Sequence, residues 1–219
     1  MSAQGPAKLV YRAERHPGFD REGFRARWRR HAALGMAQAR WTNILRYAHC
    51  DPLDARAPWD GVALLWYRDE AARLAHVADA AARATMRADE AEAFARPVRE
   101  FSTLVEEVRV DGDGSGPIRH FVFLWRAPGI DRADFQARLL GMAPRRRDVL
   151  APIAGFRGLS LDLARAEAGL EGFGLDCDAI EESAWDGAAG VPAPAAPWIA
   201  RAEALATRHV PLWEAGAQA

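Results

Sequence analysis

The sequence predicts an α+β protein made of two tandem βαββαβ units whose antiparallel sheets pack together as one barrel. Three observations support this fold class: an internal repeat, the order of the strand and helix patterns, and strands that are apolar on both faces. An internal repeat determines how the rest of the chain is divided into units. Residues 16–28 (HPGFDREGFRARW) recur as residues 127–139 (APGIDRADFQARL), with seven of thirteen positions identical. We therefore expect a duplicated unit.

The repeat divides the chain into two parts. Its constant offset of 111 residues predicts a first unit over residues 1–110 and a diverged second unit over residues 118–219. Between them, residues 111–117 (DGDGSGP) are polar and rich in glycine, which is typical of a linker.

Each copy of the repeat has the pattern of a turn followed by a capped helix. After Pro-Gly, Asp20 stands where a carboxylate can accept from the free N–H groups of a first helical turn. Phe19 before this cap and Phe24 after it form a hydrophobic staple. The second copy repeats the pattern around Asp131.

The remaining hydrophobic patterns complete the two units. The first unit is expected to contain strand 8–14, helix 20–40, strands 44–50 and 62–67, a long helix from Asp69 to before Pro97, and strand 103–110. The second is expected to contain strand 119–126, helix 131–148, strands 156–163 and 178–185, a short helix over 195–207, and an edge or irregular segment at Pro211. The order βαββαβ is that of the ferredoxin-like unit.

Two of these strands have no polar face. Residues 62–67 (VALLWY) and 121–125 (FVFLW) are apolar throughout. An antiparallel sheet with helices on one side alone would show a polar second face. We therefore expect the two sheets to cover each other as an intramolecular pseudo-dimer.

Composition excludes several functions. The 29 basic residues nearly cancel the 30 acidic ones, which argues against a nucleic-acid or membrane partner. Lys8 is the only lysine, so it is the one candidate for amine chemistry. Two cysteines are too few for a disulfide framework, and the six histidines are dispersed along the sequence, so we expect no metal site. The sequence has no phosphate-binding or zinc motif, so we expect no cofactor. The opening residues lack a secretory pattern, which predicts a cytoplasmic protein.

The first half resembles EthD-like proteins of the dimeric α/β-barrel group. The resemblance rests on residues 17–31 (PGFDREGFRARWRRH), 45–47 (LRY) and 59–66 (WDGVALLW), and it covers about residues 8–110. It implies a small-molecule pocket inside the barrel or at its mouth, in a group that includes cofactor-free enzymes and haem-dependent members. The helix histidine, His31, follows Trp28 by three residues here, where the family pattern has four. In the second copy Met142 stands in its place.

Candidate site residues come from this first half. His31, on the apolar face of the first helix, is the expected catalytic base, and Tyr47 is its expected oxygen-binding partner. The candidate substrate-binding residues are Tyr11, Trp28, His49, Asp60, Trp66 and Tyr67. Each also has a structural interpretation, as a core aromatic, a satisfied histidine or, for Asp60, a turn cap.

Three functional hypotheses remain open from the sequence. The first is cofactor-independent proton transfer, of the lyase, cyclase or isomerase type, on an aromatic or polyketide-like metabolite. The second is a barrel that binds a small ligand without catalysis, which the loss of the histidine in the second copy favours. The third is haem binding. The expected partner is a small molecule, and the duplicated chain could also pair with a second copy.

Overall fold

The computed structural model describes residues 7–165, 174–175, 177–188 and 190–216. Its helices are α1 (Arg21–Met36), α2 (Glu70–Ala78), α3 (Ala80–Ala93) and α4 (Arg132–Leu150), with short 3-10 helices η1 (Ala39–Asn43) and η2 (Val98–Phe101). Its strands are β1 (Ala7–Ala13), β2 (Ile44–Pro52), β3 (Gly61–Tyr67), β4 (Ser102–Gly112), β5 (Ile118–Arg126), β6 (Phe156–Ala164), β7 (Ala179–Trp185) and β8 (Ile199–Glu214). Among the described residues, no helix is long and apolar enough to cross a membrane.

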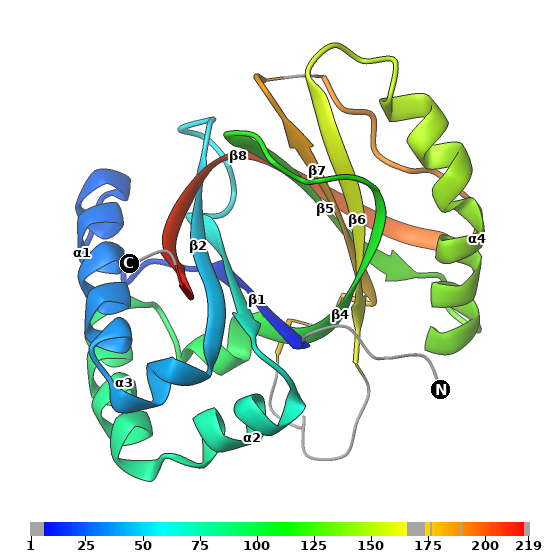
Figure 1. The fold of residues 1–219 in the computed structure, drawn as a ribbon. Coiled ribbons are helices and arrows are strands. Elements are labelled where there is room, and N and C mark those ends of the chain that lie inside the picture. Colours follow the sequence, from blue (N-terminus) through cyan, green and yellow to red (C-terminus); the bar gives the residue numbers. More distant parts are fainter. Residues whose placement is uncertain (1–6, 166–173, 176, 189, 217–219) are drawn as a thin grey trace.

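The eight strands form one closed antiparallel barrel (Figure 1). Their order around it is β1-β3-β2-β8-β5-β7-β6-β4. Each half therefore contributes a sheet in which its fourth, first, third and second strands are neighbours. The barrel closes where β2 pairs with β8 and where β4 pairs with β6, for example at Cys50–His209 and Val108–Leu161. The predicted fold class, two sheets that complete one barrel, is confirmed.

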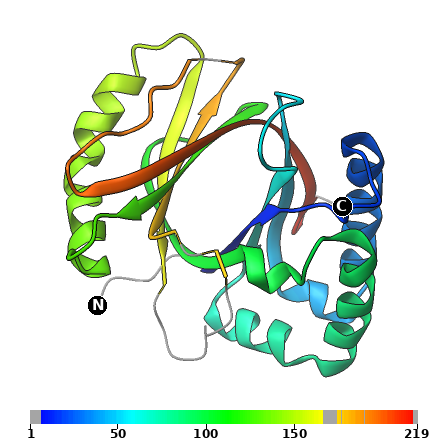
Figure 2. The same cartoon turned by 180° about the vertical axis from the view of Figure 1, so that it is seen from behind.

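The helices lie outside the barrel, as Figure 1 and the reverse view in Figure 2 show. Helices α1, α2 and α3 cover the outer face of the first sheet, and α4 covers the second. Side chains alternate between the two faces of each strand. On β1, Val10 belongs to the interior core, whereas Tyr11 and Ala13 pack under the helices. This alternation explains why strands such as β3 are buried on both faces.

Two predicted helices differ from the structure. Residues 195–207 do not form a helix, because most of them belong to strand β8, which pairs with β5 on one side and β2 on the other. Helix propensity is a weak preference that closing a barrel overrides. Pro211 lies within this strand, at a register shift opposite Ala48, where its missing N–H is tolerated.

The long helix expected after Asp69 is two helices. Asp79 ends α2 with an extended backbone conformation (ψ 96°), and its side chain accepts from Ala82 N at the start of α3. An aspartate in an alanine-rich segment is a good N-cap, so it starts a new helix at this point. Helix α3 therefore does not have to continue the direction of α2 and packs against α1.

The repeated turn has the same local structure in both halves. Asp20 accepts from Gly23 N at 2.7 Å, and Asp131 accepts from Asp134 N at 2.7 Å. The staple residue Phe24 is fully buried under the sheet. The capped turn was therefore predicted correctly from the sequence.

A second feature recurs with the turn, which we call the carboxylate clamp. In the first half, Asp60 accepts from Arg15 N at 3.0 Å and forms ion pairs with the guanidinium groups of Arg15 and Arg21. In the second half, Asp178 makes the corresponding contacts with Arg126 and Arg132. Each clamp ties the start of the third strand of its sheet to the end of the first strand and the start of the helix.

Replacing Asp60 with asparagine is expected to lower stability without affecting chemistry. The change removes the charge that Arg15 and Arg21 share, which should cost about 1.5–3 kcal/mol, the usual value for hydrogen bonds to charged groups. Urea unfolding measures this loss, and Asp178→Asn should give a similar one. If Asp60→Asn left stability unchanged but abolished ligand binding, the structural role would be wrong.

Candidate active site between the first sheet and its helices

A cavity of about 100 Å³ lies between the outer face of the first sheet and the helices that cover it. It is lined by Tyr11, His31, Ala32, Gly35, Arg40, Trp41, Tyr47, Leu65, His76, Met86 and Glu90. The two predicted catalytic residues, His31 and Tyr47, therefore line one cavity. It lies outside the barrel, whereas the family resemblance implied a pocket inside the barrel or at its mouth.

His31 is positioned by helix α1 and by a carboxylate from helix α3. Phe24, Trp28 and His31 are buried on one face of α1, and Nδ1 of His31 lies 2.6 Å from Oδ2 of Asp89. Arg27 donates to both carboxylate oxygens of Asp89. Although burial opposes ionisation, the bonds from Arg27 and His31 lower the pKa of Asp89, so it accepts as a carboxylate.

This arrangement sets the protonation state of His31. Burial lowers the pKa of His31, although Asp89 partly offsets this effect, so the ring is neutral at pH 7. Its Nδ1–H donates to Asp89, which leaves a lone pair on Nε2. No described residue forms a hydrogen bond to Nε2. His31 is thus an oriented, unprotonated base.

A hydrogen-bonded chain behind the cavity fixes the state of His49. Arg29 Nη1 contacts His49 Nδ1, and a guanidinium can only donate, so Nδ1 accepts and the ring proton lies on Nε2. Burial and the charge of Arg29 hold the pKa of His49 well below its ordinary value. Nε2 of His49 therefore donates to the hydroxyl of Tyr47, 2.7 Å away.

At the end of this hydrogen-bonded series, one of the two phenol protons of Tyr11 and Tyr47 has no acceptor in the protein as described. Trp28 Nε1 donates to the hydroxyl oxygen of Tyr11 at 2.8 Å, and the hydroxyls of Tyr11 and Tyr47 are 3.4 Å apart. Burial raises the pKa of Tyr11 to about 12 and that of Tyr47 well above its ordinary value, so both keep their protons. Only one proton can lie between the two oxygens. The other O–H has no acceptor among the described residues and can donate to a ligand.

The remaining predicted residues divide between this site and other places. Trp28 stacks on His49 with ring centroids 3.6 Å apart, and neither residue lines the cavity. Tyr67 lies in the same layer, edge-on to His76, but does not line the cavity. Trp66 points into the barrel, on the opposite face of the sheet. Asp60 belongs to the carboxylate clamp.

Five polar residues of the site were not predicted from the sequence: Arg40, Trp41, His76, Asp89 and Glu90. Asp89 and Glu90 follow the buried Ala82 and Met86 at helical spacing on α3. Two acidic residues on an otherwise apolar helix face were the pattern from which this part of the site could have been predicted. Burial raises the pKa of Glu90, so it is a second acid–base group at the cavity. The buried indole Nε1 of Trp41 has no hydrogen-bond partner among the described residues.

His76 makes stability depend on pH. Burial, with the charge of Arg40, lowers the pKa of His76 from 6.5 to about 4. Between these values the unfolded chain binds more protons than the folded one, so stability should fall as the pH decreases, by about 3 kcal/mol from this group. Urea unfolding between pH 7 and pH 4 measures the slope. The slope should flatten in His76→Gln, and an unchanged slope would contradict the assignment.

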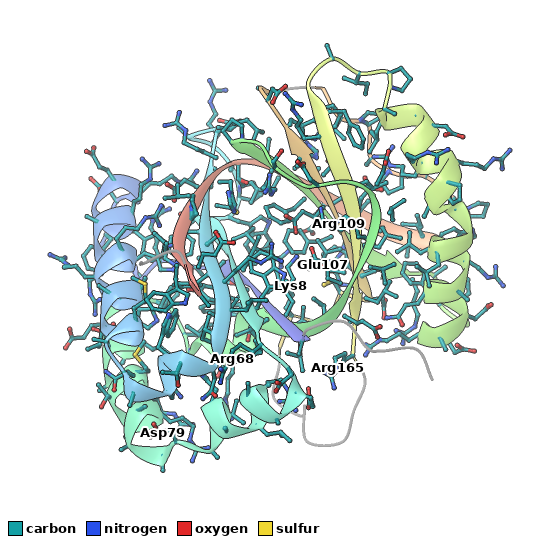
Figure 3. All side chains as sticks on the ribbon, in the orientation of Figure 1. Lys8, Arg68, Asp79, Glu107, Arg109 and Arg165 are labelled. Atoms are coloured by element: carbon teal, nitrogen blue, oxygen red, sulfur yellow. The ribbon has the colours of Figure 1, made fainter. Side chains whose placement is uncertain are left out.

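A second polar cluster lies inside the barrel, around the fully buried Lys8 (Figure 3). Lys8 Nζ donates to Asp162 at 2.8 Å and to Glu182 at 2.7 Å, and lies 3.7 Å from Glu107. Burial opposes its charge, but these carboxylates raise the pKa of Lys8 above its ordinary value. The amine is therefore protonated and cannot attack a carbonyl to form a Schiff base.

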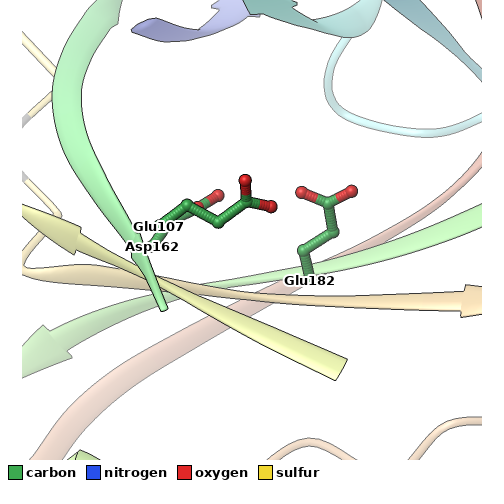
Figure 4. A group of neighbouring side chains, drawn as sticks. All are labelled: Glu107, Asp162 and Glu182. Carbon is green, nitrogen blue, oxygen red and sulfur yellow. The ribbon is translucent and has the colours of Figure 1, made fainter. Parts of the chain in front are cut away.

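The same three carboxylates are the residues most able to hold a metal ion (Figure 4). One oxygen from each of Glu107, Asp162 and Glu182 lies within 4.8 Å of the others. Lys8 Nζ, however, contacts all three and lies where a cation would bind. The cluster thus joins strands of both halves through a buried ammonium.

The barrel and its outer helices define a protein of the dimeric α/β-barrel class. Residues 16–97 match the EthD domain family, so this part of the chain is similar to that family. The match ends within the first half, and it contains His31, Tyr47 and Asp89. No curated protein sequence matches the chain.

Solved structures with the same fold cover nearly the whole chain. An anthrone oxidase-like protein has a TM-score of 0.63 and 13% identity, over 95% of this chain and 92% of that chain. A protein described as a "Putative Chlorite dismutase" has a TM-score of 0.56 and 10% identity, over 93% and 94%. One described as a "Putative monooxygenase", from Fusobacterium nucleatum subsp. nucleatum ATCC 25586, has a TM-score of 0.53 and 10% identity, over 95% and 94%. At these identities the likeness extends to the fold alone.

Proposed function

We propose that the protein is an enzyme that catalyses cofactor-independent proton transfer, of the lyase, cyclase or isomerase type, on an aromatic or polyketide-like metabolite. One observation carries the proposal: the unprotonated base His31 and a spare phenol O–H of Tyr11 or Tyr47 line one cavity. Removal of a proton beside a carbonyl group requires this pair, a base and a donor to the developing oxyanion.

The residues have separate roles in this reaction. His31 Nε2 takes a proton from a carbon next to the carbonyl of the ligand, and the electron pair of the C–H bond moves to the carbonyl oxygen. The spare phenol O–H donates to that oxygen, while Asp89 stabilises the imidazolium. Return of the proton from His31 to a different carbon completes an isomerisation, and no oxidant or reductant is consumed.

The cavity walls favour an aromatic ligand. Tyr11, Trp41 and Tyr47 present rings to the cavity, whose volume is about 100 Å³. A cavity of about 150 Å³ accommodates benzene, so a ligand of one or more rings requires the wall to move. Met86 is the flexible part of this wall. The anthrone oxidase-like structure, although similar only in fold, suggests aryl ketones as the first compounds to test.

Deuterium exchange tests the proposal without knowledge of the natural substrate. Acetophenone and anthrone each carry exchangeable hydrogens on carbon next to, or conjugated with, a carbonyl group. Proton NMR in D₂O should show exchange into at least one of them that is faster than buffer and proportional to protein concentration. If either compound binds but exchanges no faster than in buffer, proton abstraction is rejected for it, and failure of both rejects the aryl ketone class.

A second candidate function is ligand binding without catalysis. The second half has Met142 where His31 stands, so the duplicated fold persists without the base. A melting temperature that rises with an aryl ketone, together with no exchange, would favour this candidate. Haem does not fit the cavity, because about 100 Å³ is far too small for a macrocycle. A Soret band after addition of haem would contradict that conclusion.

A further inference from the structure

A second cavity, of about 160 Å³, lies at one mouth of the barrel, near the Lys8 cluster. Among its lining residues are Arg46, Trp66, Arg109, Pro211 and Trp213. The cavity borders the seam between β2 and β8, where the register shifts opposite Pro211. Of the residues assigned to proton transfer, Tyr47 alone also lines this cavity, whereas His31 and Tyr11 do not.

The acidic groups at the base of this cavity already have partners. Glu182 accepts from Lys8 at 2.7 Å and lies 3.0 Å from Arg119 Nε. Glu107 accepts from Trp66 Nε1 at 2.8 Å, which also fixes the indole ring. These carboxylates therefore need no further cation from a ligand.

The two arginines at the rim have weaker partners, and Arg46 lies over the Trp66 ring, 4.4 Å from its centroid. Their shortest ion pairs, both with Glu107, are 3.9 Å for Arg46 and 3.7 Å for Arg109, beyond hydrogen-bonding distance. Neither guanidinium makes a hydrogen bond to any residue in the described part of the chain. The side chains of Arg46 and Arg109 are 40% and 39% exposed. Two planar groups of N–H donors thus border one cavity with their donors unused by the protein.

The backbone at Gly114 leaves room for Arg109 in this position. Gly114 has a φ of +66°, and a Cβ there would lie 2.1 Å from Arg109 Nη1. A side chain at residue 114 would displace the guanidinium. The glycine in the connection between the sheets therefore makes room for Arg109 at the mouth of the barrel.

We propose that this cavity binds a small planar carboxylate, with its carboxylate group between Arg46 and Arg109 and its ring against Pro211 and Trp213, next to the Trp66 indole that Arg46 covers. Guanidinium groups bind carboxylates through paired N–H donors, and the volume matches one aromatic ring. Asp113 and Glu214 also lie at the rim. Their charges oppose an anion, so binding depends on both arginines together.

NMR with benzoate as the probe tests this site. The indole N–H signal of Trp66, assigned by its loss in Trp66→Phe, should shift saturably with benzoate. Benzamide, which has the same shape without the charge, should bind far more weakly. Arg46→Gln and Arg109→Gln should each weaken benzoate binding by about tenfold, as expected when one charge-assisted contact is lost. Arg145→Gln, at an exposed position on α4, is the matched control and should have no effect.

Three results would overturn the site: equal binding of benzamide, unchanged binding in both arginine variants, or an effect of Arg145→Gln as large as theirs. His31→Gln separates the two cavities. Benzoate should still shift the Trp66 signal in this variant, and loss of binding would place the probe in the His31 cavity instead. The result is independent of whether the protein catalyses proton transfer.

Discussion

Replacing Lys8 with methionine is expected to destabilise the protein by about 3–5 kcal/mol at neutral pH, the typical cost of removing one partner of a buried ion pair. Methionine has a similar length and fills the same space, so the effect comes from charge. Asp162 and Glu182 would each lose a hydrogen-bonded ammonium in a place without solvent. Because the cluster joins strands of both sheets, we expect the two sheets of this variant to unfold together in one transition.

The pH dependence of this variant identifies the cause. Without the ammonium, burial raises the pKa values of the carboxyl groups above their unfolded values, so the folded state is least stable when they are ionised. The stability of Lys8→Met should therefore approach that of the unmodified protein as the pH decreases from 7 toward 4.

Urea unfolding of both proteins across this range measures the difference. Arg157→Met, which removes the cation of the exposed pair with Asp186, is the control and should change little. A loss in Lys8→Met that does not depend on pH would point to packing instead.

Replacing His31 with glutamine is expected to slow deuterium exchange by about 10²–10⁴-fold, the usual contribution of a general base. Glutamine keeps much of the volume and a polar end, and Asp89 stays paired with Arg27, so the fold should persist. Exchange into anthrone or acetophenone, measured beside the melting temperature, separates the two effects. His120→Gln changes another buried histidine, in the second half, and is the matched control. Exchange unchanged in His31→Gln would reject the histidine as the base.

Asp89 is a positioning residue, and its role gives a distinct signature. Because Asp89 raises the pKa of His31, Asp89→Asn should lower that pKa and shift the acid limb of the exchange rate to lower pH. The rate at the plateau should also fall, since the imidazolium loses its carboxylate. A variant that changed only the melting temperature would indicate a purely structural aspartate.

The order and approximate bounds of most strands could be predicted because apolar alternation and turn residues are local properties. The capped turns at Asp20 and Asp131 are local for the same reason. The prediction was wrong for residues 195–207, where alanine, glutamate and arginine suggest a helix but the chain is held as β8 between β2 and β5. It also missed the cap at Asp79, which divides one helix pattern into α2 and α3.

The candidate site shows a similar division. His31 and Tyr47 could be proposed from their places on a helix face and a strand, and that proposal stays a prediction. Asp89 could not be connected to His31, because they are 58 residues apart and meet only when α3 packs on α1. Likewise, Trp66 and Tyr67 are neighbours in sequence but lie on opposite faces of β3.

By itself, the sequence determined the duplication, the α+β class and the need for the two apolar sheets to cover each other. Tertiary structure alone decided where the charges meet. Lys8, Asp162 and Glu182 come from three strands, and the spare phenol proton depends on contacts among β1, β2 and α1. The physical reason is that hydrophobic patterning acts over a few residues, whereas hydrogen bonds and ion pairs form between any groups that closure of the barrel brings within about 3 Å.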